Sequence, residues 1–164
     1  MEEETQESEQ YNFEEDYESL KKQHNLPDFE ALAQDFDIEK IADKEPLFLA
    51  REIRRIINEK ITAYIHLFET LINPTAPPMF VFKILKNMTE EEKKEIQEFY
   101  KVLSKAQIEI MKLDTIYKEE DEIKFINDNF KIWQEMKSKI HTLFESFQTN
   151  FENGNIEKER SYFD

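Results

Sequence analysis

Glycine is almost absent from this chain. It occurs once in 164 residues, at Gly154, and proline occurs five times. A β-sheet protein needs glycine-containing turns between its strands, whereas long helices with few connections need almost none. The composition therefore predicts an all-α fold. The same scarcity excludes the known phosphate-binding loops of nucleotide-binding proteins, because those loops need several glycines where the backbone approaches the phosphate.

Cysteine and long apolar runs are also missing. Without cysteine there is no disulfide, thiolate zinc site or cysteine nucleophile. The longest apolar runs, such as residues 79–82, are far shorter than the ~20 residues that span a bilayer. The first residues are acidic and no apolar run follows them, so we expect no signal peptide. We therefore expect a cytoplasmic protein with no membrane partner.

The net charge of −15 is distributed unevenly. Residues 1–20 hold nine acidic side chains and no Lys or Arg, whereas the rest of the chain holds 28 acidic and 22 basic side chains. A charged segment with few aliphatic residues buries too little apolar surface to offset the entropy lost on ordering. We therefore predict that residues 1–25 form a disordered acidic tail. An acidic chain repels phosphate backbones, so we expect no direct nucleic-acid partner.

The strongest periodic pattern lies in residues 89–113. Thr89 and Glu92 match a capping box, which marks the start of a helix. Apolar residues then recur at steps of three and four, the spacing of a coiled-coil seam. The residues of this seam are Ile96, Phe99, Leu103, Ala106, Ile110 and Leu113. Similar apolar stripes predict two more long helices, over residues 46–72 and 117–152.

Proline and glycine mark the ends of these two helices. Pro46 suits the first position of a helix, and Asn73-Pro74 ends the same helix. Gly154 is placed for a left-handed cap after the last helix. A shorter amphipathic helix is predicted over residues 28–36.

Together these segments predict one domain over residues 26–153. It is an antiparallel bundle of three long helices, with one or two short N-terminal helices packed on it. Residues 154–164 are expected to form a frayed end. In the connection over residues 73–88, the apolar part is either a helical turn on the end of the bundle, which we favour, or an extended segment.

The chain is rich in aromatic residues, with 14 Phe, six Tyr and one Trp. The simpler interpretation is a bulky core. The alternative is that part of the aromatic stripe stays exposed as a docking or dimer surface. Both a monomer and a homodimer remain open.

No pattern in the chain indicates a cofactor or a catalytic site. A di-metal centre in a helical bundle needs Glu-x-x-His on each of two helices. The residues three positions before the three histidines are Lys21, Ala63 and Ser138, none of them a carboxylate. His66 and His141 each precede a glutamate on the same helix face, which we interpret as surface neighbours. We expect no metal, no cofactor and no catalytic residue.

Three sets of residues are candidates for binding a partner. The first set, in the acidic segment, is Tyr11, Phe13 and Tyr17. The second set, in the connection, is Met79, Phe80 and Phe82. The third set is a cationic cluster, Arg51, Arg54 and Arg55. These arginines either neutralise carboxylates on facing helices, which we favour, or bind an acidic partner or the chain's own tail.

The sequence thus favours a non-enzymatic protein-interaction module or accessory subunit that binds a protein partner. One alternative is an acidic mimic of nucleic acid that inhibits a basic protein. A remote alternative is a metalloenzyme on the bundle scaffold.

Overall fold

The computed structural model describes residues 11–43 and 45–160, with side chains up to residue 153. Within these ranges the chain forms six α-helices, one 3-10 helix and no strand, so the prediction of an all-α fold is confirmed. The helices are α1 (Phe13–His24), α2 (Phe29–Phe36), the 3-10 helix η1 (Ile38–Ile41), α3 (Leu49–Ile72), α4 (Met79–Asn87), α5 (Glu90–Leu113) and α6 (Glu119–Arg160).

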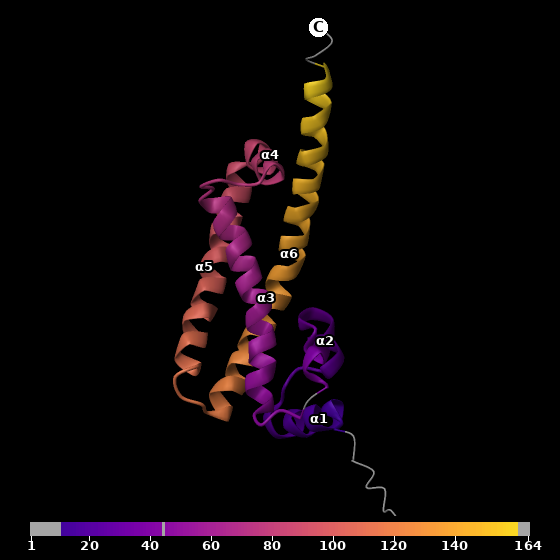
Figure 1. The fold of residues 1–164 in the computed structure, drawn as a ribbon, viewed down its shortest axis with the longest axis vertical. Helices are drawn as coiled ribbons and strands as arrows, with labels where there is room; N and C mark the ends of the chain where they lie inside the picture. The colour runs from indigo at the N-terminus through magenta and orange to yellow at the C-terminus, as the bar shows by residue number, and fades with distance from the viewer. Residues whose placement is uncertain (1–10, 44, 161–164) are drawn as a thin grey trace, which may run out of the picture.

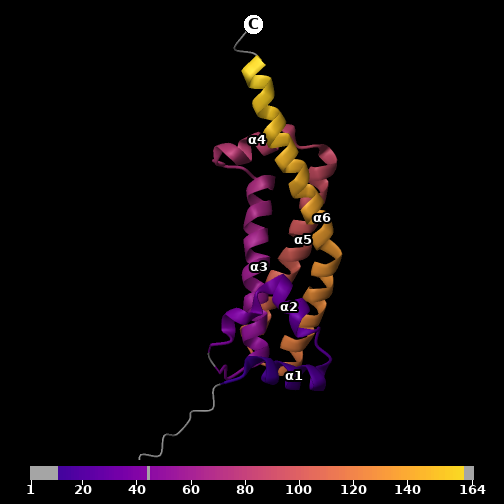
Figure 2. The same ribbon diagram turned by 90° about the vertical axis from the view of Figure 1, so that its right-hand side faces the viewer.

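The three long helices α3, α5 and α6 form the body of the molecule (Figures 1 and 2). They run up, down and up, because α4 turns the chain at one end and residues 114–118 turn it at the other. α3 packs against both α5 and α6, and the contact between α5 and α6 is smaller. This is the predicted antiparallel bundle.

The core follows the predicted apolar stripes. All six residues of the α5 seam are buried. Phe68 of α3 meets Phe99 of α5 with ring centroids 5.7 Å apart, and Tyr64 of α3 meets Trp133 of α6 at 5.3 Å. Burying such large rings is the main favourable contribution to folding. These four aromatic residues therefore fill the space between the long helices, as the simpler interpretation expected.

The N-terminal segment corrects the sequence analysis. Residues 11–25 were predicted to be disordered, but α1 forms there and buries Phe13 and Tyr17 in the common core. Three of its four acidic residues lie in the first turn, where the positive end of the helix dipole stabilises their charges. Asn12 caps this end, and Asn25 ends the helix with a positive φ of 53°. The part of the prediction that covers residues 1–10 lies outside the described residues.

The short helices α2 and η1 cover the lower half of the bundle beside α3 (Figure 2). Phe36 of α2 packs on Trp133 of α6, with ring centroids 6.0 Å apart. The short N-terminal helices therefore pack on the bundle as predicted. The packed domain, however, begins before residue 26, because α1 shares its core.

Two predicted helix ends are wrong. α3 begins at Leu49 rather than Pro46, and the ring of Phe48 packs on Tyr117 just before it. α6 continues through Gly154 to Arg160, so this glycine lies within the helix and does not form a left-handed cap. Glycine permits a left-handed cap but does not require one, and within a helix it costs only about 1 kcal/mol relative to alanine.

The apolar connection forms the helix α4, in line with the favoured interpretation. It lies across the upper end of the bundle, beside α6 (Figure 1). The following helix starts as predicted, with a complete capping box between Thr89 and Glu92. α6 spans 42 residues against 24 in α3 and in α5, so its end projects beyond α4 (Figures 1 and 2). Among the described residues, no helix is long and apolar enough to cross a membrane.

Candidate functional site

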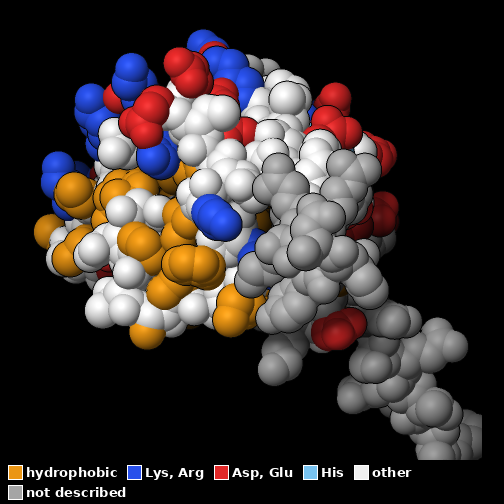
Figure 3. All heavy atoms as spheres, turned by 90° about the horizontal axis from the view of Figure 1, so that it is seen from above, with side chains coloured by type: hydrophobic (Ala, Val, Ile, Leu, Met, Phe, Trp, Pro, Cys, Tyr) orange, Lys and Arg blue, Asp and Glu red, His pale blue; other side chains and the backbone are white. Residues whose placement is uncertain are grey.

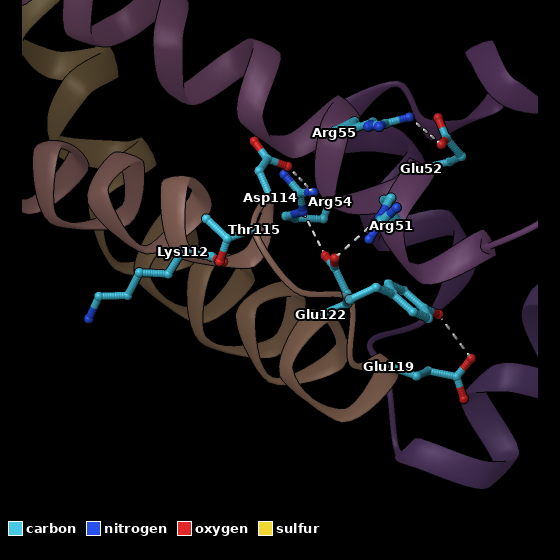
Figure 4. A network of polar contacts seen from close by, with 10 residues as sticks. Arg51, Glu52, Arg54, Arg55, Lys112, Asp114, Thr115, Glu119 and Glu122 are labelled. Carbon is cyan, nitrogen blue, oxygen red and sulfur yellow. Dashed lines mark hydrogen bonds and ion pairs between the residues drawn. The ribbon is translucent and has the colours of Figure 1, made fainter.

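Arg54, in the middle of the arginine cluster, lies inside the fold rather than on a free surface. The side chain of Arg54 is only 1 % exposed. Its Nε donates to Glu122 Oε2 at 2.6 Å, and its Nη2 donates to Asp114 Oδ1 at 2.7 Å (Figure 4). Arg54 therefore joins α3 to the start of α6 and to the connection after α5. It neutralises carboxylates as the favoured interpretation held, and it is not available to a partner.

Glu122 is the centre of this network. It is 0 % exposed, and its Oε1 lies 3.6 Å from Nε of Arg51. Because Glu122 lies in the first turn of α6, the positive end of the helix dipole also stabilises its charge. Arg51 lies over the ring of Tyr117, with Cζ 4.5 Å from the ring centroid. The network holds two like charges around one buried carboxylate, which is the arrangement of a structural ion-pair cluster.

Arg55 differs from its two neighbours. Its side chain is half exposed, and Nη1 donates to Oε1 of Glu52 on the same helix at 2.6 Å. An exposed pair of this kind contributes little to stability. Of the three candidate arginines, only Arg55 projects toward solvent.

The aromatic candidates of the N-terminal segment also lie in the interior. Phe13 and Tyr17 are buried, and each packs edge-on against Phe29. The hydroxyl of Tyr17 donates to the carbonyl of Pro27 at 2.7 Å, and burial raises the pKa of Tyr17 above its ordinary value. Tyr11 is half-buried, and burial together with Asp16 raises its pKa to about 12. Phe13 and Tyr17 therefore hold α1 in place and offer no surface to a partner.

A second polar cluster, which the sequence did not indicate, ties α2 to the bundle. Oδ2 of Asp35 accepts hydrogen bonds from Gln134 at 2.6 Å and from Lys137 at 3.0 Å. Burial alone would raise the pKa of Asp35, but these hydrogen bonds and the Lys137 charge outweigh it and lower the pKa. Lys60 donates to the carbonyl of Asp35, and its ammonium lies 4.4 Å from the centroid of the Trp133 ring. Burial lowers the pKa of Lys60. No spacing in the sequence joins residues so far apart in the chain.

The remaining candidates, Met79, Phe80 and Phe82, form an exposed patch that we name the α4 surface. Their exposed fractions are 73 %, 54 % and 57 %. Hydrophobic side chains gather on one side of the upper end of the molecule, and Lys or Arg side chains border them (Figure 3). This is the one candidate set that the structure leaves in contact with solvent as a group.

The fold does not account for these three side chains. α4 packs through Val81, Ile84 and Leu85, and Met88 packs directly after it. These four residues recur at steps of three and four and are buried or half-buried. A helix on the surface of a bundle normally carries polar residues on its other face. In α4 the exposed positions in the first turn are Met79, Phe80 and Phe82 instead.

Elsewhere in the described part of the chain, no group of three or more His, Asp or Glu side chains could hold a metal ion. His141 lies 3.5 Å from Oε1 of Glu145 on the same helix, and both side chains are exposed. The described side chains thus include two polar clusters that join the helices, and the exposed α4 surface.

No family model matches the chain, and comparisons with curated proteins and with solved structures found no match.

Proposed function

We propose that this protein is a non-enzymatic interaction module, or accessory subunit, that binds a protein partner through the α4 surface. The observation that carries the proposal is the exposure of Met79, Phe80 and Phe82 on one short helix. Aromatic and methionine side chains are enriched where proteins bind one another. Each such side chain gains about 1.5–3 kcal/mol when it is fully removed from water.

Among the described residues, no other group of exposed apolar side chains contains two aromatic rings that are more than half exposed. On α5, Ile108 and Met111 are exposed at 58 % and 64 %, and neither is aromatic. Leu47 and Ile116 are exposed in two connections that meet where the ring of Phe48, itself 38 % exposed, packs on Tyr117. Scattered exposed apolar residues are normal on a protein surface, whereas a larger aromatic patch marks an interaction site. This contrast favours α4 as the binding element.

The interior positions of the other candidates support the same choice. Arg54, Phe13 and Tyr17 are needed inside the domain, so a partner could reach them only by unfolding part of it. Met79 and Phe82 are already exposed, and binding through them requires no rearrangement of the core.

The test compares two matched double variants of the full-length protein as baits in cells of the source organism. Met79→Gln with Phe82→Gln removes two apolar side chains from α4, and Ile108→Gln with Met111→Gln removes two from α5. Glutamine keeps a high helix propensity, so we expect both variants to melt within a few degrees of the unmodified protein, as circular dichroism would show. Losing two interface anchors reduces affinity about tenfold or more.

We therefore expect quantitative mass spectrometry to find a specific set of proteins reduced with the α4 variant and retained with the α5 variant. If both variants recover the same proteins in the same amounts as the unmodified bait, the α4 surface is not the binding site and the proposal is wrong.

A further inference from the structure

The segment that carries the α4 surface is exceptional for its lack of acidic residues. Residues 70–89 contain no Asp or Glu, although the chain holds 37 of them. The next longest stretch without an acidic residue, residues 99–108, is half as long. Within residues 70–89 the charged side chains are Lys83 and Lys86, both on α4. The apolar patch therefore lies on a cationic segment of a strongly acidic protein.

We infer that the partner of the α4 surface is an acidic amphipathic helix, whose apolar side chains cover Met79, Phe80 and Phe82 and whose carboxylates face the exposed Lys86 of α4. This inference rests on the proposed function and specifies the chemistry of the partner. Charge complementarity carries it. A partner with carboxylates beside its apolar anchors meets Lys86 here, within the longest stretch of the sequence that has no acidic residue.

The position of α6 favours a helix-sized partner. The upper part of α6 runs beside α4, where Asn87 Nδ2 donates to the carbonyl of Asn150 at 3.3 Å. The ammonium of Lys83 lies 4.7 Å from the centroid of the Phe151 ring, so its charge is held at the junction of the two helices. α6 then continues past α4 (Figures 1 and 2). α4 and α6 lie side by side here, and an amphipathic helix binds an apolar surface through anchors that recur at steps of three and four residues.

The same projection argues against a bilayer as the occupant. A flat anionic membrane would meet the end of α6, which projects beyond α4, before it reached the α4 surface.

A second copy of this chain is also disfavoured. In a two-fold symmetric dimer the same patch lies on both sides of the interface. Two α4 surfaces in contact would bring the lysines of one copy against those of the other, and like charges at an interface are unfavourable.

The test uses three synthetic helical peptides with one shared leucine stripe and with Glu, Gln or Lys at all other positions. Each peptide carries a fluorophore, and its anisotropy is measured against the full-length protein at low and at physiological salt. We expect the Glu peptide to bind more tightly than the Gln peptide and the Lys peptide to bind weakest. We expect salt to narrow the differences, because it screens exposed charges.

Two charge reversals locate the effect. Lys86→Glu should weaken binding of the Glu peptide about fivefold, the upper range for one exposed charge pair. Lys131→Glu is the matched control, because Lys131 is exposed on α6 and lines the groove of about 590 Å³ between α5 and α6. It should leave binding unchanged. If Lys131→Glu weakens binding and Lys86→Glu does not, the peptide lies in that groove and the inference is wrong.

Further outcomes also overturn the inference. If the Glu and Gln peptides bind equally tightly, charge has no role in binding at this surface. If the Glu peptide shows no saturable binding, the partner is not an acidic helix. If the protein sediments with phosphatidylserine-containing vesicles, the α4 surface is assigned to a membrane. If light scattering shows a dimer that Met79→Gln with Phe82→Gln dissociates, the surface is assigned to a second copy of the chain. The bait comparison decides the proposed function separately, since it does not depend on the charge of the partner.

Discussion

Arg54 shows how one residue can carry a full charge into the interior of a small bundle. Its guanidinium contacts Glu122, which is itself fully buried, and Asp114 at the end of α5. Taking both ions from water is unfavourable, and their attraction offsets this only while both are present. The pair therefore fixes how α3 meets α6 more than it adds to stability.

We predict that Arg54→Met lowers the free energy of unfolding by about 3–5 kcal/mol, because it leaves Glu122 buried without its closest cation. Urea unfolding measures this change. Arg55→Met is the matched control, with an expected loss of no more than about 1 kcal/mol, since its pair with Glu52 is exposed. The double variant Arg54→Met with Glu122→Leu should recover part of the loss. Equal effects of Arg54→Met and Arg55→Met would contradict the structural role of the cluster.

α6 is the element whose end departs most from its local sequence pattern. Gly154 follows Phe151, the last aromatic residue of the apolar stripe, and this position is typical of a glycine that ends a helix with a left-handed cap. The structure continues the helix to Arg160 instead. These two conformations respond in opposite ways to a β-carbon, because alanine stabilises a helix and disfavours a positive φ.

We predict that Gly154→Ala strengthens the upper part of α6 by about 0.5–1 kcal/mol. Backbone chemical shifts of residues 150–160 should move toward helical values, and amide exchange there should slow. Thr142→Ala, at an exposed position lower in α6, serves as the control for a general gain in helix propensity and should leave residues 150–160 unchanged. A loss of helical shifts in Gly154→Ala would mean that the helix ends at the glycine.

At the scale of the whole molecule, the short N-terminal helices and the long bundle share one core. Trp133, the single tryptophan, contacts Phe36 of α2 and Tyr64 of α3, so its fluorescence reports on both parts. The Asp35 cluster adds polar contacts across the same boundary. A domain of this size with one core is expected to unfold in a single transition.

We predict that Trp133 fluorescence and far-ultraviolet circular dichroism follow the same urea transition. Phe36→Ala should shift both probes equally, by about 3–5 kcal/mol, because it opens a cavity in the shared core. If the short helices detached first, the fluorescence transition alone would move to lower urea. That result would separate the molecule into two units.

The helices of the bundle could be predicted because their evidence is local. The α5 seam from Ile96 to Leu113 and the capping box at Thr89 depend on residues a few positions apart, and the structure confirms both. The segment of α1 carried the same kind of evidence, with Phe13 and Tyr17 four residues apart after the cap at Asn12. The prediction of disorder rested on the acidic composition of this segment, although acidic residues in a first turn favour a helix.

The candidate binding residues could be predicted only as residue types. The sequence placed aromatics, methionine and arginines in three clusters, but no local pattern distinguishes Tyr17, which is buried, from Phe82, which is exposed. Arg54 and Glu122 are 68 positions apart, and no periodicity relates them.

The amino-acid sequence by itself determined that this chain is all-α, with long amphipathic helices, because helix periodicity and the scarcity of glycine act on neighbouring residues. Only the tertiary structure decided which apolar and charged side chains the core uses. Burial depends on how distant segments pack. This packing buries Phe13, Tyr17 and Arg54 and leaves Met79, Phe80 and Phe82 exposed.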